Sequence, residues 1–130
     1  DNIVYIDDYA HHPKEISESI SAVRNMYPNR KLTVIFQPHL YSRTNDFSNE
    51  LASSLSKTDE LILLDIYAAR EEEIDGVSSE MLFDKCTLES KELSTLDTVV
   101  NLISEKDIDV LLTLGAGDIS TIVNPIKNQL

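Results

Sequence analysis

The sequence predicts an α/β fold in which a doubly wound, mostly parallel sheet carries helices on both faces. Short, continuous apolar runs alternate along the chain with segments whose apolar residues recur at helical spacing. Continuous rather than alternating apolar runs are typical of parallel strands that are buried on both faces. No internal repeat or low-complexity linker interrupts the 130 residues, so a single domain spanning residues 1–130 is expected.

The strands are predicted where β-branched and other apolar residues run together. A short buried strand is expected first, and the most strongly patterned strand is expected near the end of the chain. A brief additional strand is expected at residues 87–89. The four main strands are predicted at residues 3–6, 32–36, 61–64 and 110–114.

The helices are predicted from apolar residues three, four and seven positions apart and from capping residues. Pro13 is placed where a first helical turn tolerates proline, and Ser42 or Thr44 is predicted to cap the second helix. A charged loop at residues 70–74 ends at Gly76, and Ser78 is predicted to cap the next, short helix. The predicted buried faces comprise Ile16, Ile20, Val23 and Tyr27; Phe47, Leu51 and Leu55; Met81, Leu82 and Phe83; Leu96, Val99, Val100 and Ile103; and Ile122, Val123 and Ile126.

Composition excludes several classes of partner. Eleven basic against 23 acidic residues give a formal net charge of −12, with no basic patch, so we expect no binding to nucleic acid or to an anionic membrane. No apolar run approaches the roughly 20 residues of a membrane span. The single cysteine, Cys86, forms no internal disulfide and is expected to be a small buried hydrophobe, which fits a cytoplasmic protein.

Polar and aromatic residues gather where the predicted strands end. The first strand leads into "DDYAHHPKEI", the second into "QPHLYSR", the third into "DIYAAR" and the last into "GAGD". Because ligands of parallel α/β sheets bind outside the carboxyl ends of the strands, these loops predict a functional edge. All three histidines of the chain lie in the first two loops.

Several of these residues also have a purely structural interpretation. The pair His11-His12 could be a solvated turn, Asp65 could cap its loop, and Arg70 could belong to a solvated charge run. A metal site needs three or four converging ligands, and none is predicted. The segment "GAGDIS" has two glycines at dinucleotide spacing but Ser120 in the third place, which predicts a tight turn offering N–H groups to an anion.

Five segments, "DDYAHHPKEI", "FQPHLYSRT", "LLDIYAAREE", "IDGVSSEML" and "LLTLGAGDI", occur in the order found in the carboxy-terminal domain of the Mur ligases. From Asp1 almost to the end, the chain resembles that Rossmann-like domain in the members that join L-alanine to UDP-N-acetylmuramate. The resemblance implies a three-domain parent, in which a separate central domain binds ATP and Mg²⁺. ATP phosphorylates the muramate carboxylate, and the amine of L-alanine attacks the acyl phosphate. The chain opens almost directly into a strand, which fits a domain cut from a longer polypeptide, and we expect it to be inactive alone.

The resemblance also implies roles for residues in the first two loops. Tyr9, His11, His39 and Arg43 match positions that bind the amino acid, with Arg43 the candidate for holding its carboxylate through two hydrogen bonds. Asp7 and His12 match positions on the ATP side, with Asp7 facing the ribose. No residue is assigned as a general base.

One position departs from the family pattern, and two rival interpretations remain. Some members carry a second arginine directly after the histidine of the second loop, where this chain has Leu40, so Arg43 acts with His39 or with another group. The recycling murein-peptide ligases share the first loop, although "QPHLYSRT" suits the alanine-adding members better. A receiver- or flavodoxin-like binding module also has an acidic pair after its first strand, but here no lysine follows the last strand.

Overall fold

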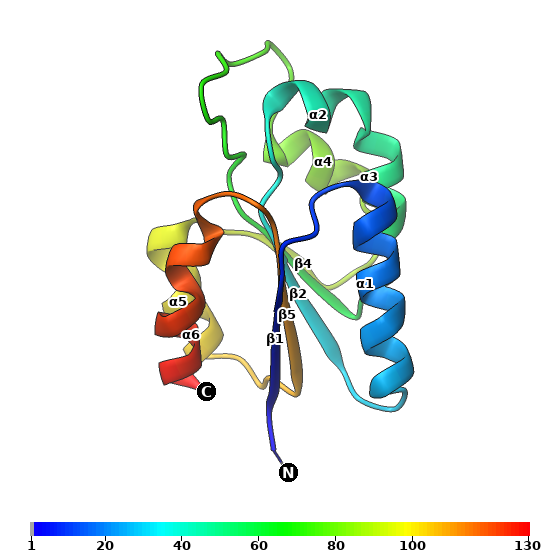
Figure 1. Cartoon of the computed structure of the whole chain (residues 1–130), viewed down its shortest axis with the longest axis vertical. Coiled ribbons are helices and arrows are strands. Elements are labelled where there is room, and N and C mark those ends of the chain that lie inside the picture. The colour runs from blue at the N-terminus through cyan, green and yellow to red at the C-terminus, as the bar shows by residue number, and fades with distance from the viewer. Residues whose placement is uncertain (1) are drawn as a thin grey trace.

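Five parallel strands form one twisted sheet in the computed structural model, which describes residues 2–130 (Figure 1). Their order across the sheet is β1-β5-β2-β3-β4, so β5 is inserted between β1 and β2. Every pair of neighbouring strands runs parallel. The strands are β1 (Val4–Asp8), β2 (Leu32–Phe36), β3 (Glu60–Leu63), β4 (Lys91–Leu93) and β5 (Val110–Leu114).

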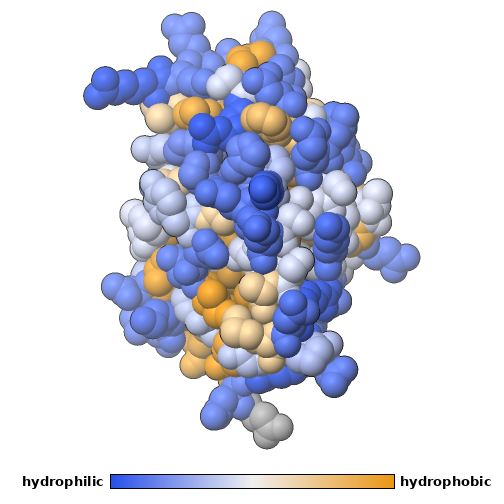
Figure 2. All heavy atoms as spheres, turned by 45° about the vertical axis from the view of Figure 1, so that its right-hand side comes forward, coloured by the Kyte–Doolittle hydropathy of each residue, from blue (hydrophilic) through white to orange (hydrophobic). Residues whose placement is uncertain are grey.

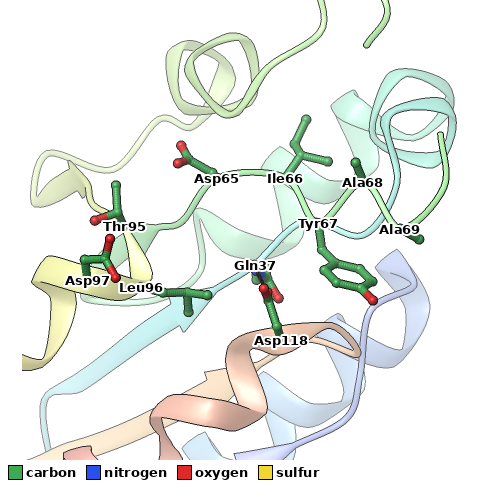
Figure 3. A pocket seen from close by; sticks show the side chains of 10 residues that line it. All are labelled: Gln37, Asp65, Ile66, Tyr67, Ala68, Ala69, Thr95, Leu96, Asp97 and Asp118. Carbon is green, nitrogen blue, oxygen red and sulfur yellow. Dashed lines mark hydrogen bonds between the residues drawn. The ribbon is translucent and has the colours of Figure 1, made fainter. Parts of the chain in front are cut away.

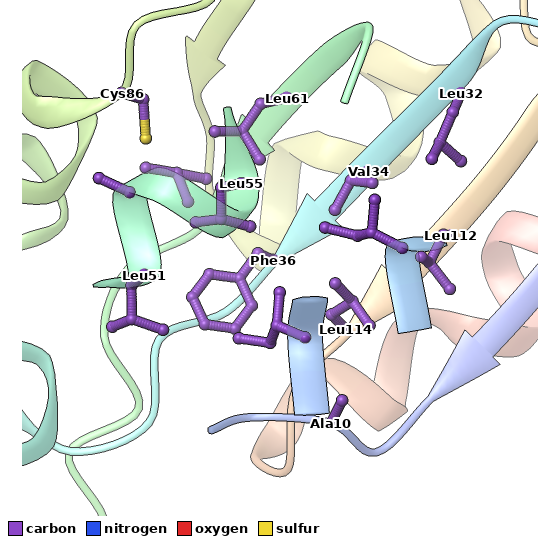
Figure 4. Packing of buried hydrophobic residues seen from close by; sticks show 14 of the residues in the cluster. Ala10, Leu32, Val34, Phe36, Leu51, Leu55, Leu61, Cys86, Leu112 and Leu114 are labelled. Atoms are coloured by element: carbon purple, nitrogen blue, oxygen red, sulfur yellow. The ribbon is translucent and has the colours of Figure 1, made fainter. Parts of the chain in front are cut away.

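Helices cover both faces of this sheet, as predicted. One face carries α1 (Pro13–Met26), α3 (Ser48–Leu55) and α4 (Ser79–Lys85), and the other carries α5 (Leu96–Ser104) and α6 (Val123–Gln129) (Figure 1). Two hydrophobic clusters fill the spaces between the layers. Phe36, Leu51, Leu55 and Leu114 pack together in the first cluster (Figure 4). Ile35, Ile62, Val99 and Ile126 belong to the second.

How far each strand is buried follows from its position in the sheet. Every residue of β2, β3 and β5 is buried, because helices cover both faces and a strand lies on each side. The edge strand β1 pairs only with β5 and is half-buried rather than buried, which corrects the sequence-based prediction. It also extends to Asp8, so Asp7 and Asp8 belong to the strand and not to the loop after it.

Most of the remaining elements match their predictions, with three exceptions. The strand expected at residues 87–89 is wrong, because the last edge strand is β4, at Lys91–Leu93. The single helix expected after residue 42 is two helices, α2 (Tyr41–Asp46) and α3, separated by Phe47. Neither Ser42 nor Thr44 caps it, since both residues lie inside α2.

The turn after β5 leads first into a short 3₁₀ helix, η1 (Asp118–Ile122), and then into α6. The connections that follow β1, β2, β3 and β5 all leave from the upper end of the sheet in Figure 1. The face shown in Figure 2 is mostly hydrophilic, with a smaller group of apolar residues in its lower half. Among residues 2–130, no helix combines the length and the apolar character needed to cross a membrane.

Candidate functional site

Four aromatic side chains from three different loops form a continuous row at the carboxyl end of the sheet. The ring centroids are 5.7 Å apart between Tyr9 and His11, 5.3 Å between His11 and His39, and 5.5 Å between His39 and Tyr67. The His39 and Tyr67 rings are stacked at 23°, whereas Tyr9 meets His11 edge to face at 83°. We call these four residues the aromatic row. Three of them, Tyr9, His11 and His39, were predicted to share one site, and the structure brings them together.

Backbone pairing between the second and third loops fixes the centre of the row. Tyr67 N donates to Pro38 O at 2.9 Å, and Leu40 N donates to Tyr67 O at 2.8 Å. His39 and Tyr67 thereby form an isolated parallel bridge that continues the pairing of β2 with β3 beyond the ends of the strands. His39 is therefore held by the sheet itself and not by a free loop.

The environment of His39 favours its neutral form. Burial lowers the pKa of His39, and the nearby positive charges of His11 and Arg43 lower it further, while Glu71 opposes them. Its Nδ1 atom is buried and has no hydrogen-bond partner among residues 2–130. A neutral imidazole with an unpartnered ring nitrogen is a group that can accept or donate one hydrogen bond to a ligand.

Arg43 is the cation beside this row. It lies in α2, half-buried, and its guanidinium forms no ion pair or hydrogen bond within the described part of the chain. Its charge helps to lower the pKa of His39, so the two groups lie near each other. Four of the other lysine and arginine side chains, by contrast, are paired with acids: Arg24, Arg30, Lys31 and Lys106. A planar guanidinium without an internal partner can hold a carboxylate through two parallel hydrogen bonds.

His12 has a structural role that the sequence did not reveal. It is the N-cap of α1, where its Nδ1 accepts from Lys14 N at 3.4 Å. Glu15 completes a capping box by accepting from the backbone N–H groups of His12 and His11. The His12 ring packs against Phe47, with centroids 5.1 Å apart, and so lies apart from the aromatic row.

Asp7 and Asp8 separate to opposite faces of β1. Asp7 Oδ1 accepts from Thr113 Oγ1 at 2.6 Å, and Thr113 in turn accepts from the Tyr5 hydroxyl at 3.0 Å. The other oxygen of exposed Asp7 has no partner among residues 2–130, which leaves it free to accept from a hydroxyl such as that of a ribose. Asp8 accepts from Ala10 N and from Ser19, 3.0 and 2.6 Å away, and so ties the first loop to α1.

The glycine loop packs closely against the aromatic row. A Cβ atom on Gly117 would lie 2.5 Å from Tyr67 Cγ and 2.7 Å from Gln37 Oε1, so only glycine fits. Buried Gln37 donates to Asp118 and accepts from Ile119 N at 3.0 Å. Gln37 thus occupies one N–H group of the turn that was predicted to offer such groups to an anion.

A cavity of about 520 Å³ lies beside Tyr67, between the ends of β2 and β3 and the first turns of α5 and η1 (Figure 3). Three carboxylates line it, those of Asp65, Asp97 and Asp118. Such a lining repels phosphates, so a triphosphate does not fit here. Within residues 2–130, no group of three His, Cys, Asp or Glu side chains could hold a metal ion. Of the groups implied by the family, an amino acid suits the chemistry of Arg43 and the aromatic row, and a ribose hydroxyl suits the open oxygen of Asp7.

Sequence reasoning missed three residues that build the site: Gln37, Tyr67 and Glu71. Each lies within eight residues after the end of a predicted strand, and this position alone could have indicated that it belongs to the functional edge of the sheet. Its contact partners lie in other loops, and only the folded chain shows them.

Comparison with known proteins identifies the family of this chain. Residues 1–117 match the family model described as Mur ligase, glutamate ligase domain. The UDP-N-acetylmuramate–L-alanine ligase of Parabacteroides distasonis is 52% identical over 130 residues, which are 100% of this chain and 28% of that protein. The chain therefore spans less than a third of the length of this curated relative.

Two solved structures share the fold. The UDP-N-acetylmuramate–alanine ligase of Thermotoga maritima superimposes with a TM-score of 0.75 at 28% identity, over 98% of this chain and 26% of that one. A murein peptide ligase from Psychrobacter arcticus gives the same TM-score of 0.75 at 20% identity, over 98% and 27%, which shows a common fold alone. The family match covers nine-tenths of the chain, and the loops that it includes carry the aromatic row and Arg43. The chain therefore belongs to the Mur ligase family, as a glutamate ligase domain.

Proposed function

We propose that this chain is the carboxy-terminal domain of an ATP-dependent ligase that adds L-alanine to UDP-N-acetylmuramate in peptidoglycan synthesis. The parent is a cytoplasmic bacterial enzyme of three domains, whose other two domains hold the UDP-sugar and ATP with Mg²⁺. The observation that carries the proposal is Arg43, a half-buried guanidinium that has no acidic partner among residues 2–130. It lies beside His39, whose surroundings favour the neutral form. The 52% identity to a relative of that name supports the choice of substrate.

Arg43 holds the carboxylate of the incoming alanine, and the aromatic row lines the space around it. A guanidinium fixes both carboxylate oxygens, which orients the amine of the amino acid for attack. His39 stays neutral near neutral pH, so it hydrogen-bonds to the amino acid without adding a second positive charge that would repel its ammonium group. Tyr9, 71% exposed, and His11 form the outer wall of the site and become covered when the other domains close over it.

On the nucleotide side, Asp7 accepts a hydrogen bond from the ribose through the oxygen that Thr113 does not engage. His12 orients the first loop by capping α1, and its ring edge contacts the nucleotide. ATP supplies the phosphoryl group that activates the muramate carboxylate. We expect the isolated domain not to hydrolyse ATP, because the other domains of the parent hold the phosphates and Mg²⁺.

The test is Arg43→Ala in the full-length parent, with phosphate release measured against L-alanine concentration at saturating ATP and UDP-N-acetylmuramate. We expect the KM for alanine to rise roughly tenfold to a hundredfold, because hydrogen bonds to a charged group are lost. Arg43→Lys keeps the charge but not the paired hydrogen bonds and should give an intermediate value. Lys127→Ala, which removes an exposed charge from α6, is the matched control. An alanine dependence equal to that of the control would reject the proposed site.

A further inference from the structure

The carboxylate of Glu71 sits on the first turn of α2, the helix that carries Arg43. Its Oε1 accepts from Ser42 N at 3.1 Å, and its Oε2 accepts from the Ser42 hydroxyl, across 29 residues of sequence. These bonds, with help from the Tyr41 amide, hold the pKa of Glu71 below its usual range. Glu71 belongs to an acidic run in the sequence, but in the fold both of its carboxylate oxygens accept hydrogen bonds from Ser42.

Helix α2 lacks a cap of its own. Leu40 occupies its N-cap position, offers no polar side chain and has φ of 69°. The Thr44 hydroxyl, the nearest alternative, donates to Leu40 O at 2.7 Å and caps no N–H group. A helix of six residues is too short to be stable by itself, so its direction depends on contacts at its ends. Glu71 supplies the missing cap from a different loop.

Backbone strain marks the same contact. Among residues 2–130, the non-glycine residues with positive φ are Leu40, at 69°, and Ala69, at 54°. Leu40 immediately precedes α2, and Ala69 lies in the turn closed by the bond from Glu71 N to Ala68 O. Such conformations are unfavourable for residues other than glycine and persist where the surrounding contacts impose them, commonly at binding sites.

We propose that Glu71 is a positioning residue of the amino-acid site, which fixes the direction of Arg43 by capping α2. This inference rests on the proposed function. Glu71 does not touch the amino acid, since both its oxygens are turned to Ser42. Its removal frees the start of α2, so that Arg43 samples several directions and holds the carboxylate less often.

The first test compares Glu71→Ala, Glu71→Gln and Glu72→Ala in the full-length ligase, alongside Arg43→Ala. Glu72 is the exposed neighbour of Glu71 and serves as the control. Glu71→Ala should raise the KM for alanine roughly tenfold, with little change in kcat, because a charge-assisted cap is lost. Glu71→Gln can still accept from Ser42 N, so its KM should stay within about threefold of the unmodified enzyme. Ser42→Ala removes one donor and should shift KM in the same direction as Glu71→Ala, which provides a second reading if Glu71→Ala folds poorly.

The outcomes separate the two proposals. If Arg43→Ala raises the KM and Glu71→Ala and Ser42→Ala behave like Glu72→Ala, the positioning role is overturned and the proposed function stands. If Arg43→Ala itself changes nothing, the proposed amino-acid site fails, and the positioning role of Glu71 is overturned with it.

The second test needs no catalysis. The side chain of His39 is titrated by NMR in the 130-residue chain, where His11, Arg43 and Glu71 are the charged groups that act on it. Because the Glu71 charge raises the pKa of His39, both Glu71→Ala and Glu71→Gln should lower it, whereas Glu72→Ala should not. Amide hydrogen exchange across α2 should accelerate in Glu71→Ala alone. Unchanged exchange in α2 would overturn the proposal.

Discussion

His39 and Tyr67 stack with their ring centroids 5.5 Å apart, although they follow two different strands and lie in separate loops. His39 is half-buried at this contact, and two backbone hydrogen bonds join the second loop to the third beside it. We therefore expect the pKa of His39 to depend on Tyr67, which lies 28 positions away in the sequence.

Replacing Tyr67 with alanine should raise the pKa of His39 toward its ordinary value, because burial is the main cause of its lowering. Histidine NMR titration measures the shift. Tyr67→Phe keeps the stacked ring and is the control, for which we expect no change. A pKa that is the same in Tyr67→Ala as in the unmodified chain would show that the stack does not bury His39.

Replacing Gly117 with alanine should destabilise the fold by about 1–3 kcal/mol, since the new methyl group would overlap Tyr67 and Gln37. Gly76→Ala is a control of a different kind: nothing lies within 4 Å, but its φ of 79° disfavours alanine by about 1 kcal/mol. Urea unfolding gives both values. The steric explanation predicts that Gly117→Ala also shifts the Tyr67 resonances, and Gly76→Ala should leave them in place.

Replacing Glu60 with glutamine should make the free energy of unfolding less dependent on pH in the acid range. Burial alone would raise the pKa of Glu60, but hydrogen bonds from Lys106 and Thr33 and the charges of Lys106 and Lys31 outweigh it and lower the pKa. Because the pKa is lower in the folded state, the ionised carboxylate stabilises the fold at pH values above its ordinary pKa of about 4.5. This stabilisation is lost as the pH falls through the pKa of the folded state.

Glu60→Gln should therefore cost about 1–3 kcal/mol at pH 7, and the difference from the unmodified chain should shrink below pH 4.5, its ordinary value. Urea unfolding at a series of pH values measures this. Glu105→Gln, on an exposed carboxylate, should show no such pH-dependent difference. A constant difference across the acid range would contradict the role of the Glu60 charge.

Replacing His12 with alanine should cost about 1 kcal/mol of stability, because α1 loses its side-chain cap. Asparagine is a favoured N-cap, so His12→Asn should recover most of that loss. Urea unfolding checks the cap, and the KM for ATP in the parent checks the proposed nucleotide contact. A raised KM for ATP in both variants would support that contact, and an asparagine variant as unstable as the alanine variant would contradict the capping role.

Local sequence patterns predicted most of the elements. The bounds of β2 and β5 agree with the prediction because each is a run of five apolar or β-branched residues, which leaves little freedom in a parallel sheet. The cap at Ser78 and the buried face of α1 follow from interactions within one turn of helix, so they also agree. The failure at β4 lies at an edge of the sheet, because β4 carries the half-exposed pattern of a strand with one neighbour, which apolar runs do not signal. The break between α2 and α3 was also missed, since the apolar spacing continues across it.

The candidate site divides in the same way. Its location was predictable because parallel strands must end at one edge, and Tyr9, His11 and His39 do meet there. The actual partners of these groups were not predictable from local pattern. Glu71 looked like one member of an acidic run, and the glycine loop looked like a place for an anion.

By itself, the sequence determined the alternation of strands and helices, the covered faces of the sheet, the edge that carries polar residues and the family to which the chain belongs. The tertiary structure decided that Tyr67 stacks on His39, that Gln37 occupies the turn at Gly117 and that Glu71 caps the helix of Arg43. The physical reason is range. Helix periodicity and strand burial act between residues a few positions apart, whereas these contacts join loops separated by some 28 to 82 residues and exist only once the sheet brings its strand ends together.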